Sequence, residues 1–513
     1  MSKSGRILTV LGALVLGWGL TVGAHAAPSG EQLVAQKGCA SCHGAKGEGN
    51  PQAGFPRLAG EPASYLEAQL KAFASGERPN AIMHGQAQGL SADEMAAIAG
   101  YYAGLEEPAA AGAQIDKKVL GEGREIVVNG LWQKNVPSCQ ACHGPGARGF
   151  DQFPALAGQD AKYIEAQLKA WQDGKRPGGI GNLMKHVADA LDAKQIHAVA
   201  AYLASLPPTG PIPADTQPDV APSVADAMPG YFQPPLLKDL PNGKFGEAVK
   251  RGYLIFTQTP KYAGHYIGNG QSCSNCHTNA GRQADSAPMW ASWGMYPAYR
   301  GKNKKVNDMV MRLQGCFTYS ENAQGSKSGG PPPSDSPVMI DLESYMYWMS
   351  QGVATGKKMK GRGYPKLAES PKPFSRERGK DVYAANCAVC HGDNGQGRKL
   401  ADGAYMFPPL WGAQAYNWGA GMHSVAKAAD FIHHNMPFGA AGKLGLQETW
   451  DVAAWIDSHP RPQDPRYKGD LDKTIKQFHH NRKVDYYGKK VDGRVLGAPG
   501  TLEAWEQARK QGG

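Results

Sequence analysis

The apolar positions of this chain predict short amphipathic helices separated by glycine- and proline-rich stretches. Two of these helices have a complete start signal, in which a capping residue is followed three positions later by Glu or Gln. Ser91 with Glu94 forms one such capping box, and Asp192 with Gln195 forms the other. Apolar residues follow each box at helical spacing, namely Met95, Ile98, Tyr102 and Leu105, and then Ile196, Val199, Leu203 and Leu206. We also expect helices over residues 245–256, 338–349, 375–385 and 448–456.

The first half of the chain is an internal repeat, and a proline-rich segment ends it. The sequence Phe55-Pro-Arg-Leu-Ala-Gly60 recurs 98 residues later as Phe153-Pro-Ala-Leu-Ala-Gly158. Segments 65–73 and 163–171 repeat at the same offset. Residues 207–235 carry nine prolines and no pattern that predicts a helix. We interpret this segment as a stiff linker between two halves.

Charge is unevenly distributed over the 513 residues. The formal net charge is +10, but residues 27–206 carry −2 and residues 236–513 carry +13. No run of Lys or Arg resembles a nucleic-acid-binding arm. The second half is therefore expected to meet a small anionic partner rather than nucleic acid.

Residues 1–26 have the features of a secretory signal peptide. Lys3 and Arg6 precede an apolar run over residues 7–22, and Ala24-His25-Ala26 provides a cleavage site. An uncleaved membrane anchor is the alternative, but the apolar run is shorter than the roughly 20 residues that a spanning helix needs. We expect export to the periplasm, cleavage after Ala26 and no membrane span in the mature protein.

Eight of the nine cysteines lie in four copies of C-x-x-C-H, the attachment signature of haem c. The copies are Cys39 to Cys42 with His43, Cys139 to Cys142 with His143, Cys273 to Cys276 with His277, and Cys387 to Cys390 with His391. Disulfides or C-x-x-C redox sites do not explain why His follows every pair. We therefore predict four covalently attached haem c groups, each with a proximal His on its iron.

These features predict a mainly α chain with four class I cytochrome c-type domains in tandem. The expected division is a signal peptide (1–26), domain 1 (27–110), domain 2 (111–206), the linker (207–235), domain 3 (236–365), domain 4 (366–460) and a C-terminal extension (461–513). We expect the charged extension to wrap a neighbouring surface.

Each haem iron has a sixth position, whose ligand separates electron transfer from chemistry. Met83 and Met184 occupy matching places 41 and 42 residues after their motifs and are the expected ligands in domains 1 and 2. Met95 is the rival of Met83, but it belongs to an amphipathic stripe, where core packing is expected. In domain 4 we expect Met436, which precedes Pro437. Its competitors are Met406, Met422, His433, His434 and Asn435.

Domain 3 departs from this pattern because the lone Cys316 lies 40 residues after Cys276. In one interpretation Cys316 is a buried structural thiol, and Met289, Met295, Met309 or Met311 is the ligand. In the other, the Cys316 thiolate binds the iron and acts as a sulfur nucleophile. Candidate anion-binding groups surround it, namely Arg282, Arg300, Lys302, Lys304, Lys305, Arg312 and Ser320.

Several motifs of the second half resemble the thiosulfate dehydrogenases, dihaem enzymes of sulfur metabolism. They are residues 268–277, 290–300, 312–317, 360–365 and 416–422, and the loop Asn435-Met436-Pro437. Residues 27–206 look like the dihaem cytochrome that accepts electrons from such enzymes, joined here in one chain. The resemblance implies His277 with Cys316 and His391 with Met436 as axial pairs. Some relatives place a Lys before this Met as a ligand switch, which is not expected here because Asn435 occupies the position.

The resemblance also implies the reaction, in which two thiosulfate ions are coupled oxidatively to tetrathionate. Cys316 would bond the first thiosulfate, with Arg300, Arg312 and Ser320 positioning the anions. Electrons would pass to the Met436 haem, then to the Met83 and Met184 haems. They would leave to a soluble cytochrome, a high-potential iron–sulfur protein or a terminal oxidase. The same site could run in reverse as a tetrathionate reductase. The alternatives are a non-catalytic multihaem electron carrier and a Sox-type thiosulfate-conjugating haem enzyme.

Overall fold

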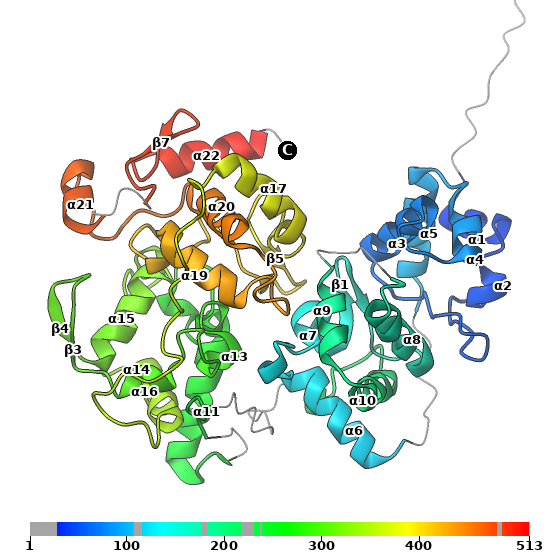
Figure 1. Ribbon diagram of the computed structural model, residues 1–513, viewed down its shortest axis with the longest axis horizontal. Helices are drawn as coiled ribbons and strands as arrows, with labels where there is room; N and C mark the ends of the chain where they lie inside the picture. Colours follow the sequence, from blue (N-terminus) through cyan, green and yellow to red (C-terminus); the bar gives the residue numbers. More distant parts are fainter. Residues whose placement is uncertain are drawn as a thin grey trace, which may run out of the picture.

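The computed structural model describes residues 28–106, 115–176, 182–216, 230–235, 239–479 and 485–511. The predicted signal peptide and residues 217–229 of the predicted linker lie outside these ranges. The chain is mainly α-helical, as predicted (Figure 1). Within the described ranges the strands form four two-stranded antiparallel sheets, which the sequence pattern did not predict. None of the helices in these ranges combines the length and apolar character that crossing a membrane requires.

Four pairs of packed helices organise the chain. They are α1 (Gly30–Gln36) with α5 (Ala92–Ala103), α6 (Lys117–Arg124) with α10 (Ala193–Ser205), α11 (Gly243–Thr257) with α16 (Pro337–Met349), and α17 (Arg376–Asn386) with α20 (Leu446–Asp457). The predicted helices over 245–256, 338–349, 375–385 and 448–456 are confirmed within these bounds. Both predicted capping boxes are also present.

Further helices and four strand pairs lie within these units, between them and after the last one. The helices are α2 (Ala40–His43), α3 (Ala63–Ser75), α4 (Ala81–Ala87), α7 (Gln140–His143), α8 (Ala161–Gln172), α9 (Leu183–Ala190), α12 (Thr259–Tyr262), α13 (Thr278–Gly281), α14 (Trp290–Trp293), α15 (Met309–Tyr319), α18 (Ala388–His391), α19 (Val425–Asn435), α21 (Leu471–Phe478) and α22 (Thr501–Gln511). The strand pairs are β1 (Arg148–Phe150) with β2 (Phe153–Ala155), β3 (Ala298–Arg300) with β4 (Lys305–Asn307), β5 (Arg398–Lys399) with β6 (Tyr405–Phe407), and β7 (Lys490–Val491) with β8 (Arg494–Val495).

A glycine lies at the crossing point of every helix pair. A Cβ atom at Gly30, Gly123, Gly252 or Gly379 would lie 2.2, 2.0, 2.0 or 2.0 Å from a backbone carbonyl oxygen of the partner helix. Any side chain there would therefore force the two helices apart. An aromatic residue of the partner helix packs beside each glycine, namely Tyr101, Tyr202, Tyr345 and Trp455. The third unit therefore has the same glycine-mediated helix crossing as the other three units.

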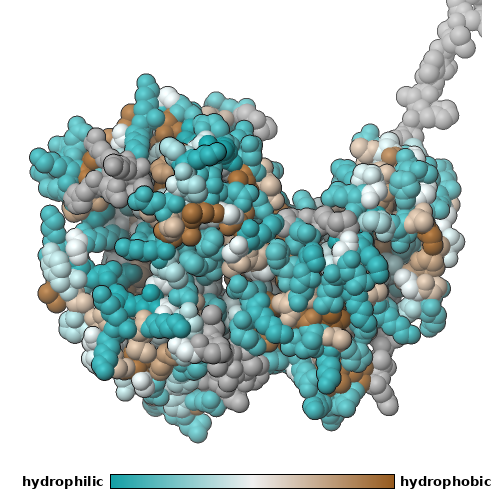
Figure 2. All heavy atoms as spheres, in the orientation of Figure 1, coloured by the Kyte–Doolittle hydropathy of each residue, from teal (hydrophilic) through white to brown (hydrophobic). Residues whose placement is uncertain are grey.

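Each helix pair is part of its own hydrophobic core, and the C-terminal extension joins the last of them. Ile475 of α21, together with Tyr487 and Leu496, is buried in the core formed around α19 and α20. The expectation that the extension wraps a neighbouring surface is therefore confirmed. The face of the molecule in Figure 2 is largely hydrophilic, with apolar residues in small scattered patches.

The two halves of the chain are in contact. In Figure 1 the unit containing α6 to α10 lies between the N-terminal unit and the part that follows residue 239. Phe407 packs against Phe150 and Phe153 with ring centroids 6.1 and 5.6 Å apart. Trp132 and Phe438 form a second aromatic contact at 5.7 Å. These contacts make the two halves one continuous body rather than two separate lobes.

The start of the predicted linker packs on the second unit. Arg148 Nη2 donates to the carbonyl oxygens of Pro207 and Thr209 at 3.1 and 2.9 Å. Gln140 Nε2 donates to Thr216 O at 2.7 Å. Residues 214–216 form a short 3₁₀ turn in a segment where no helix was expected. This turn corrects the prediction locally, because three residues are too few to leave a periodic pattern.

The helix crossings give a matched test on a single helix. Gly123→Ala places a methyl group 2.0 Å from Ala198 O, whereas Gly121→Ala meets nothing within 4 Å. We expect Gly123→Ala to destabilise the protein by about 1–3 kcal/mol through overpacking. Gly121→Ala should stabilise it by up to about 1 kcal/mol through helix propensity. Thermal unfolding of the two holoproteins checks this, and equal shifts in Tm for both variants would contradict it.

Candidate functional site

All four histidines of the C-x-x-C-H motifs are held by a backbone carbonyl. In each case Nδ1 of the ring donates: His43 to Pro56 O at 3.0 Å, His143 to Pro154 O at 2.8 Å, His277 to Ala287 O at 2.7 Å, and His391 to Pro408 O at 2.8 Å. Because a carbonyl only accepts, Nδ1 carries the proton and Nε2 is left as the metal-binding nitrogen. Burial lowers the pKa of each ring, to about 4 for His143 and His277. All four rings are therefore neutral, the form that binds iron.

None of the nine cysteines, all of which lie in the described ranges, forms a disulfide. The first two motifs open into one cavity of about 880 Å³. Met83 and Met184 both line it, whereas Met95 is buried in the helical core, as expected. A cavity that reaches the cysteines, the neutral histidines and a methionine of each motif fits the prosthetic group that the motifs predict.

A second cavity of about 780 Å³ contains the fourth motif. Cys387, Cys390 and His391 line it together with Met436. Its lining also includes Met406 and Met422, but not His433, His434 or Asn435. The structure thus leaves three methionines as candidates for the sixth position in domain 4. Met436 directly follows α19, which fixes the direction from which it enters the cavity.

The first cavity also contains a reciprocal arginine pair that the sequence analysis missed. Arg78 Nη2 donates to Tyr163 Oη and Gln167 Oε1 at 3.1 and 2.9 Å. Arg176 lies 98 residues later, at the repeat offset, and donates to Gln69 Oε1 at 3.3 Å and to Gln167 Oε1 at 2.8 Å. Guanidinium groups in this position suit the carboxylates that a haem carries. The internal repeat was the signal that could have identified them.

Cys316 lies on α15 in the third unit, next to a cation. Arg312, Cys316 and Ser320 follow one another at intervals of four residues, so α15 and its C-cap present them on one face. Arg312 Nη1 donates to Cys316 Sγ at 3.0 Å. The neighbouring Cys316 raises the pKa of Arg312. The contact places a fixed positive charge directly against the sulfur of Cys316.

Three of the four alternative methionines of domain 3 lie in the apolar core or on the surface. Met289 and Met309 are buried in the apolar core of this unit, and Met311 is exposed on the outer face of α15. Arg282, one of the expected anion-binding residues, instead donates to Pro234 O and Pro235 O at 3.2 and 2.8 Å. Arg282 therefore holds the end of the linker segment.

The hairpin of β3 and β4 carries further cations, of which Lys302 lies close enough to Cys316 for the two charges to interact. Arg300 ends β3, with its guanidinium 6.0 Å from the Tyr296 ring. Lys302 lies in the turn, and its Nζ is 3.8 Å from the centroid of the Tyr319 ring on α15. The Lys302 side chain is solvent-accessible, yet desolvation by surrounding protein, together with Arg466 and Arg312, lowers its pKa to about 7. In the sequence, Lys302 is only one of several basic residues that precede Cys316.

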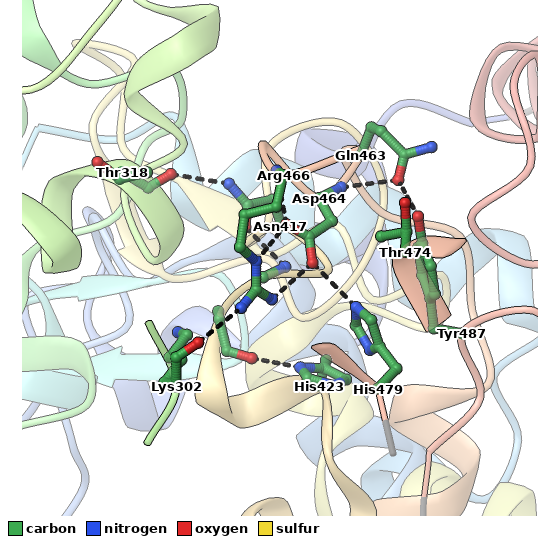
Figure 3. A network of polar contacts seen from close by, with 12 residues as sticks. Lys302, Thr318, Asn417, His423, Gln463, Asp464, Arg466, Thr474, His479 and Tyr487 are labelled. Atoms are coloured by element: carbon green, nitrogen blue, oxygen red, sulfur yellow. Dashed lines mark hydrogen bonds and ion pairs between the residues drawn. The ribbon is translucent and has the colours of Figure 1, made fainter. Parts of the chain in front are cut away.

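A buried polar network links the C-terminal extension to this region (Figure 3). Asp464 lies 2.9 Å from His479 Nε2, and Asp485 lies 2.9 Å from both His479 Nδ1 and His423 Nε2. Arg466 donates to both carboxylate oxygens of Asp464 at 2.9 and 2.6 Å. Burial alone would lower the pKa of His479, but the two carboxylates raise it above its ordinary value. The two carboxylates thus favour the protonated form of the buried His479 ring.

The fold and the four attachment motifs define a multihaem c-type cytochrome. The family model for cytochrome c matches residues 27–106, 122–207 and 376–460. Thiosulfate dehydrogenase of Stutzerimonas stutzeri is 51% identical over 268 residues, which cover 52% of this chain and 85% of that protein. The thiosulfate dehydrogenase electron acceptor of Thiomonas intermedia is 44% identical over 203 residues, covering 39% of this chain and 91% of the acceptor.

A solved structure resembles the two halves together. Thiosulfate dehydrogenase TsdBA from Marichromatium purpuratum, in its as-isolated form, matches with a TM-score of 0.79 and 43% identity. The match covers 91% of this chain and 98% of that one. The chain belongs to the thiosulfate dehydrogenase family and combines the enzyme with a homologue of its electron acceptor. It carries four haem c attachment sites.

The buried network predicts a pH-dependent contribution to stability. The contribution of His479 is present below its ordinary pKa of 6.5 and is lost as the pH rises through its raised value in the folded state. Burial would raise the pKa of Asp464, but its hydrogen bonds to His479 and Arg466 hold it well below 3.8. The contribution of Asp464 is therefore present above pH 3.8 and is lost as the pH falls through the lowered value.

We expect His479→Gln to lower Tm more at about pH 5.5 than at about pH 9. Thermal unfolding of the wild-type and variant holoproteins across this range is the measurement. His197→Gln is the matched control, because His197 is exposed and pairs only with the partly exposed Glu165 among the described residues. A loss of Tm in His479→Gln that is the same at both pH values would show that no charged His479 stabilises the fold.

Proposed function

We propose that this chain couples two thiosulfate ions oxidatively to tetrathionate at Cys316. The observation that carries the proposal is the 3.0 Å contact between Arg312 Nη1 and Cys316 Sγ. This contact lies in the unit that the cytochrome c family model leaves unmatched. A non-catalytic electron carrier would leave both residues without a role. A Sox-type conjugating enzyme is less well supported, because the relatives of this chain are named thiosulfate dehydrogenases.

The motifs and the cavities described above support an assignment of the residues that would hold the haem groups. The cysteines of the four motifs would form the thioether links and the four histidines would bind the irons. As sixth ligands we propose Met83, Met184, Cys316 and Met436 for domains 1 to 4. When bound and oxidised, the haem groups supply the acceptor for the two electrons released with each tetrathionate.

Cys316 supplies the nucleophile in the proposed mechanism. Its thiolate forms a sulfur–sulfur bond with the outer sulfur of one thiosulfate, and two electrons are removed in that step. The outer sulfur of a second thiosulfate then attacks the sulfur that carries the sulfonate group. A new sulfur–sulfur bond forms, the bond to Cys316 breaks, and tetrathionate leaves while the thiolate is restored. Run backwards, the same steps reduce tetrathionate.

Positive charge is needed because each thiosulfate carries two negative charges. Arg312 is already in contact with Cys316, and Lys302 lies close enough to both that their charges alter its pKa. We propose that these two residues and Arg300 position the anions, with Ser320 one turn beyond Cys316 as a hydroxyl donor. The net charge of +13 over residues 236–513 would attract the substrate to this half.

The contact between the halves marks the proposed route out of the enzyme half. Phe153 packs edge-on against His143 of the second motif, with ring centroids 6.1 Å apart, and it also touches Phe407. Cys390 lies close enough to Cys142 to contribute to the raised pKa of that thiol. The second and fourth motifs therefore face each other across Phe407, and we propose this contact as the crossing point. Electrons would then reach domain 1 and an external acceptor.

Two further expectations remain part of the proposal. We propose that residues 1–26 direct export to the periplasm and are removed. We also propose the domain boundaries given by the sequence analysis, since the two helices of each described pair fall within one of the four ranges.

Replacing the nucleophile tests the mechanism directly. Cys316→Ala should abolish tetrathionate formation while four haem groups remain covalently attached. Cys316→Ser is the matched variant. It keeps the approximate size of the side chain but has a hydroxyl in place of the thiol, so it lacks the sulfur needed for exchange and should be equally inactive. Product analysis with ferricyanide as acceptor is the measurement. Turnover within a few-fold of wild type in Cys316→Ala would refute the proposed role.

The lowered pKa of Lys302 predicts how substrate binding depends on pH. Lys302 is charged below about pH 7 and neutral above it, so the KM for thiosulfate should rise as the pH increases through this value. Lys302→Arg keeps the charge throughout, because a guanidinium does not lose its proton in this range. The rise in KM should therefore disappear in the variant. The same alkaline rise in both proteins would exclude Lys302 as its source.

A further inference from the structure

The C-terminal extension reaches back to the unit that carries Cys316. Arg466 lies nine residues after the end of α20, yet its Nη1 is 3.5 Å from the carbonyl oxygen of Lys302 in the β3–β4 hairpin. The same guanidinium lies 5.2 Å from the centroid of the Tyr319 ring at the end of α15. Arg466 thus touches both elements that bring cations to Cys316.

Arg466 is itself held in place. Both oxygens of the buried Asp464 accept hydrogen bonds from it, and its guanidinium packs 4.2 Å from the centroid of the Phe478 ring. The carboxylate of Asp464 neutralises the positive charge of Arg466. Arg466 is therefore suited to fixing geometry rather than to binding an anion.

Asp464 is anchored in turn by the network in Figure 3. Both ring nitrogens of His479 lie 2.9 Å from carboxylate oxygens, one from Asp464 and the other from Asp485. Asp485 also contacts His423, which belongs to the loop before α19. Asp464, His479 and Asp485 are buried and Arg466 is half-buried, so the charge-assisted hydrogen bonds that anchor Arg466 are largely shielded from water.

A second tie holds the end of α15 from the same side. Asn417 is fully buried, and its Nδ2 donates to Thr318 O at 2.9 Å while Tyr319 O accepts from its backbone amide at 3.2 Å. These bonds satisfy carbonyls that a helix end leaves without partners. The backbone at the end of α15 is thereby held, and the Tyr319 ring has Lys302 Nζ at 3.8 Å and the Arg466 guanidinium at 5.2 Å from its centroid.

We propose that Arg466 is a positioning residue of the thiosulfate site, which acts by holding Lys302 and the β3–β4 hairpin against α15 beside Arg312. This inference rests on the function proposed above. It assigns the extension a role in the enzyme half, in addition to its packing against the core of domain 4. The binding of thiosulfate depends on Arg466, whereas the sulfur chemistry at Cys316 does not.

A double-mutant cycle on the holoprotein tests this assignment. Arg466→Gln should raise the KM for thiosulfate roughly tenfold, which corresponds to about 1.4 kcal/mol, and should leave kcat within about twofold of wild type. Lys302→Met should raise KM on its own. Adding Arg466→Gln to Lys302→Met should change KM little further, because the two residues act through one interaction. Arg509→Gln is the matched control, since Arg509 lies in the same extension and pairs with Glu506.

Haem content and Tm are measured alongside the kinetics. If Arg466→Gln does not fold with four haem groups, Arg466→Lys replaces it, since Lys keeps the charge but loses the paired hydrogen bonds to Asp464. An unchanged KM in the folded Arg466 variant overturns the inference. So do effects of Arg466 and Lys302 that are fully additive, or a fall in kcat without a change in KM. A wild-type protein that does not oxidise thiosulfate would instead overturn the proposed function.

Discussion

The fold depends on burying a neutral imidazole next to each pair of attachment cysteines. A backbone carbonyl 10 to 17 residues further along the chain accepts a hydrogen bond from each of these rings. This bond fixes the tautomer, and burial keeps the second nitrogen free of a proton. The helix crossings then close the shell around each site. Because glycine lets the two helices of each pair touch, the same scaffold can be repeated four times in one chain.

The third unit shows how this scaffold can be changed without losing the fold. It keeps the buried His277 and the crossing glycine Gly252, although the cytochrome c family model does not match it. What differs is α15, on which Arg312 Nη1 contacts the sulfur of Cys316, the one cysteine outside the four motifs. Around it the hairpin of β3 and β4 and the C-terminal extension add cations and a buried anchor. Chemistry is thus added to an electron-transfer fold by a few charged contacts.

Much of this could be predicted from the sequence, because local signals were strong. The capping boxes, the 98-residue repeat and the four motifs each specify short-range structure, and the helices lie where they were expected. Long-range contacts left no such signal. The pairing of Arg78 with Tyr163 spans 85 residues, and the contact of Arg466 with Lys302 spans 164. The contacts of Arg282 with Pro234 and Pro235 left no sequence signal for the same reason, since they are set by the tertiary fold.

The most direct test of this account is the visible spectrum of the fully oxidised holoprotein during anaerobic addition of thiosulfate. The account predicts that the haem groups become reduced and that one tetrathionate appears for every two electrons taken up. A spectrum that does not change, with no tetrathionate formed, would leave only the reverse direction to be tested by adding tetrathionate to the reduced protein. If that protein also stayed unchanged, Cys316 would not be the centre of a thiosulfate enzyme and the central claim would be contradicted.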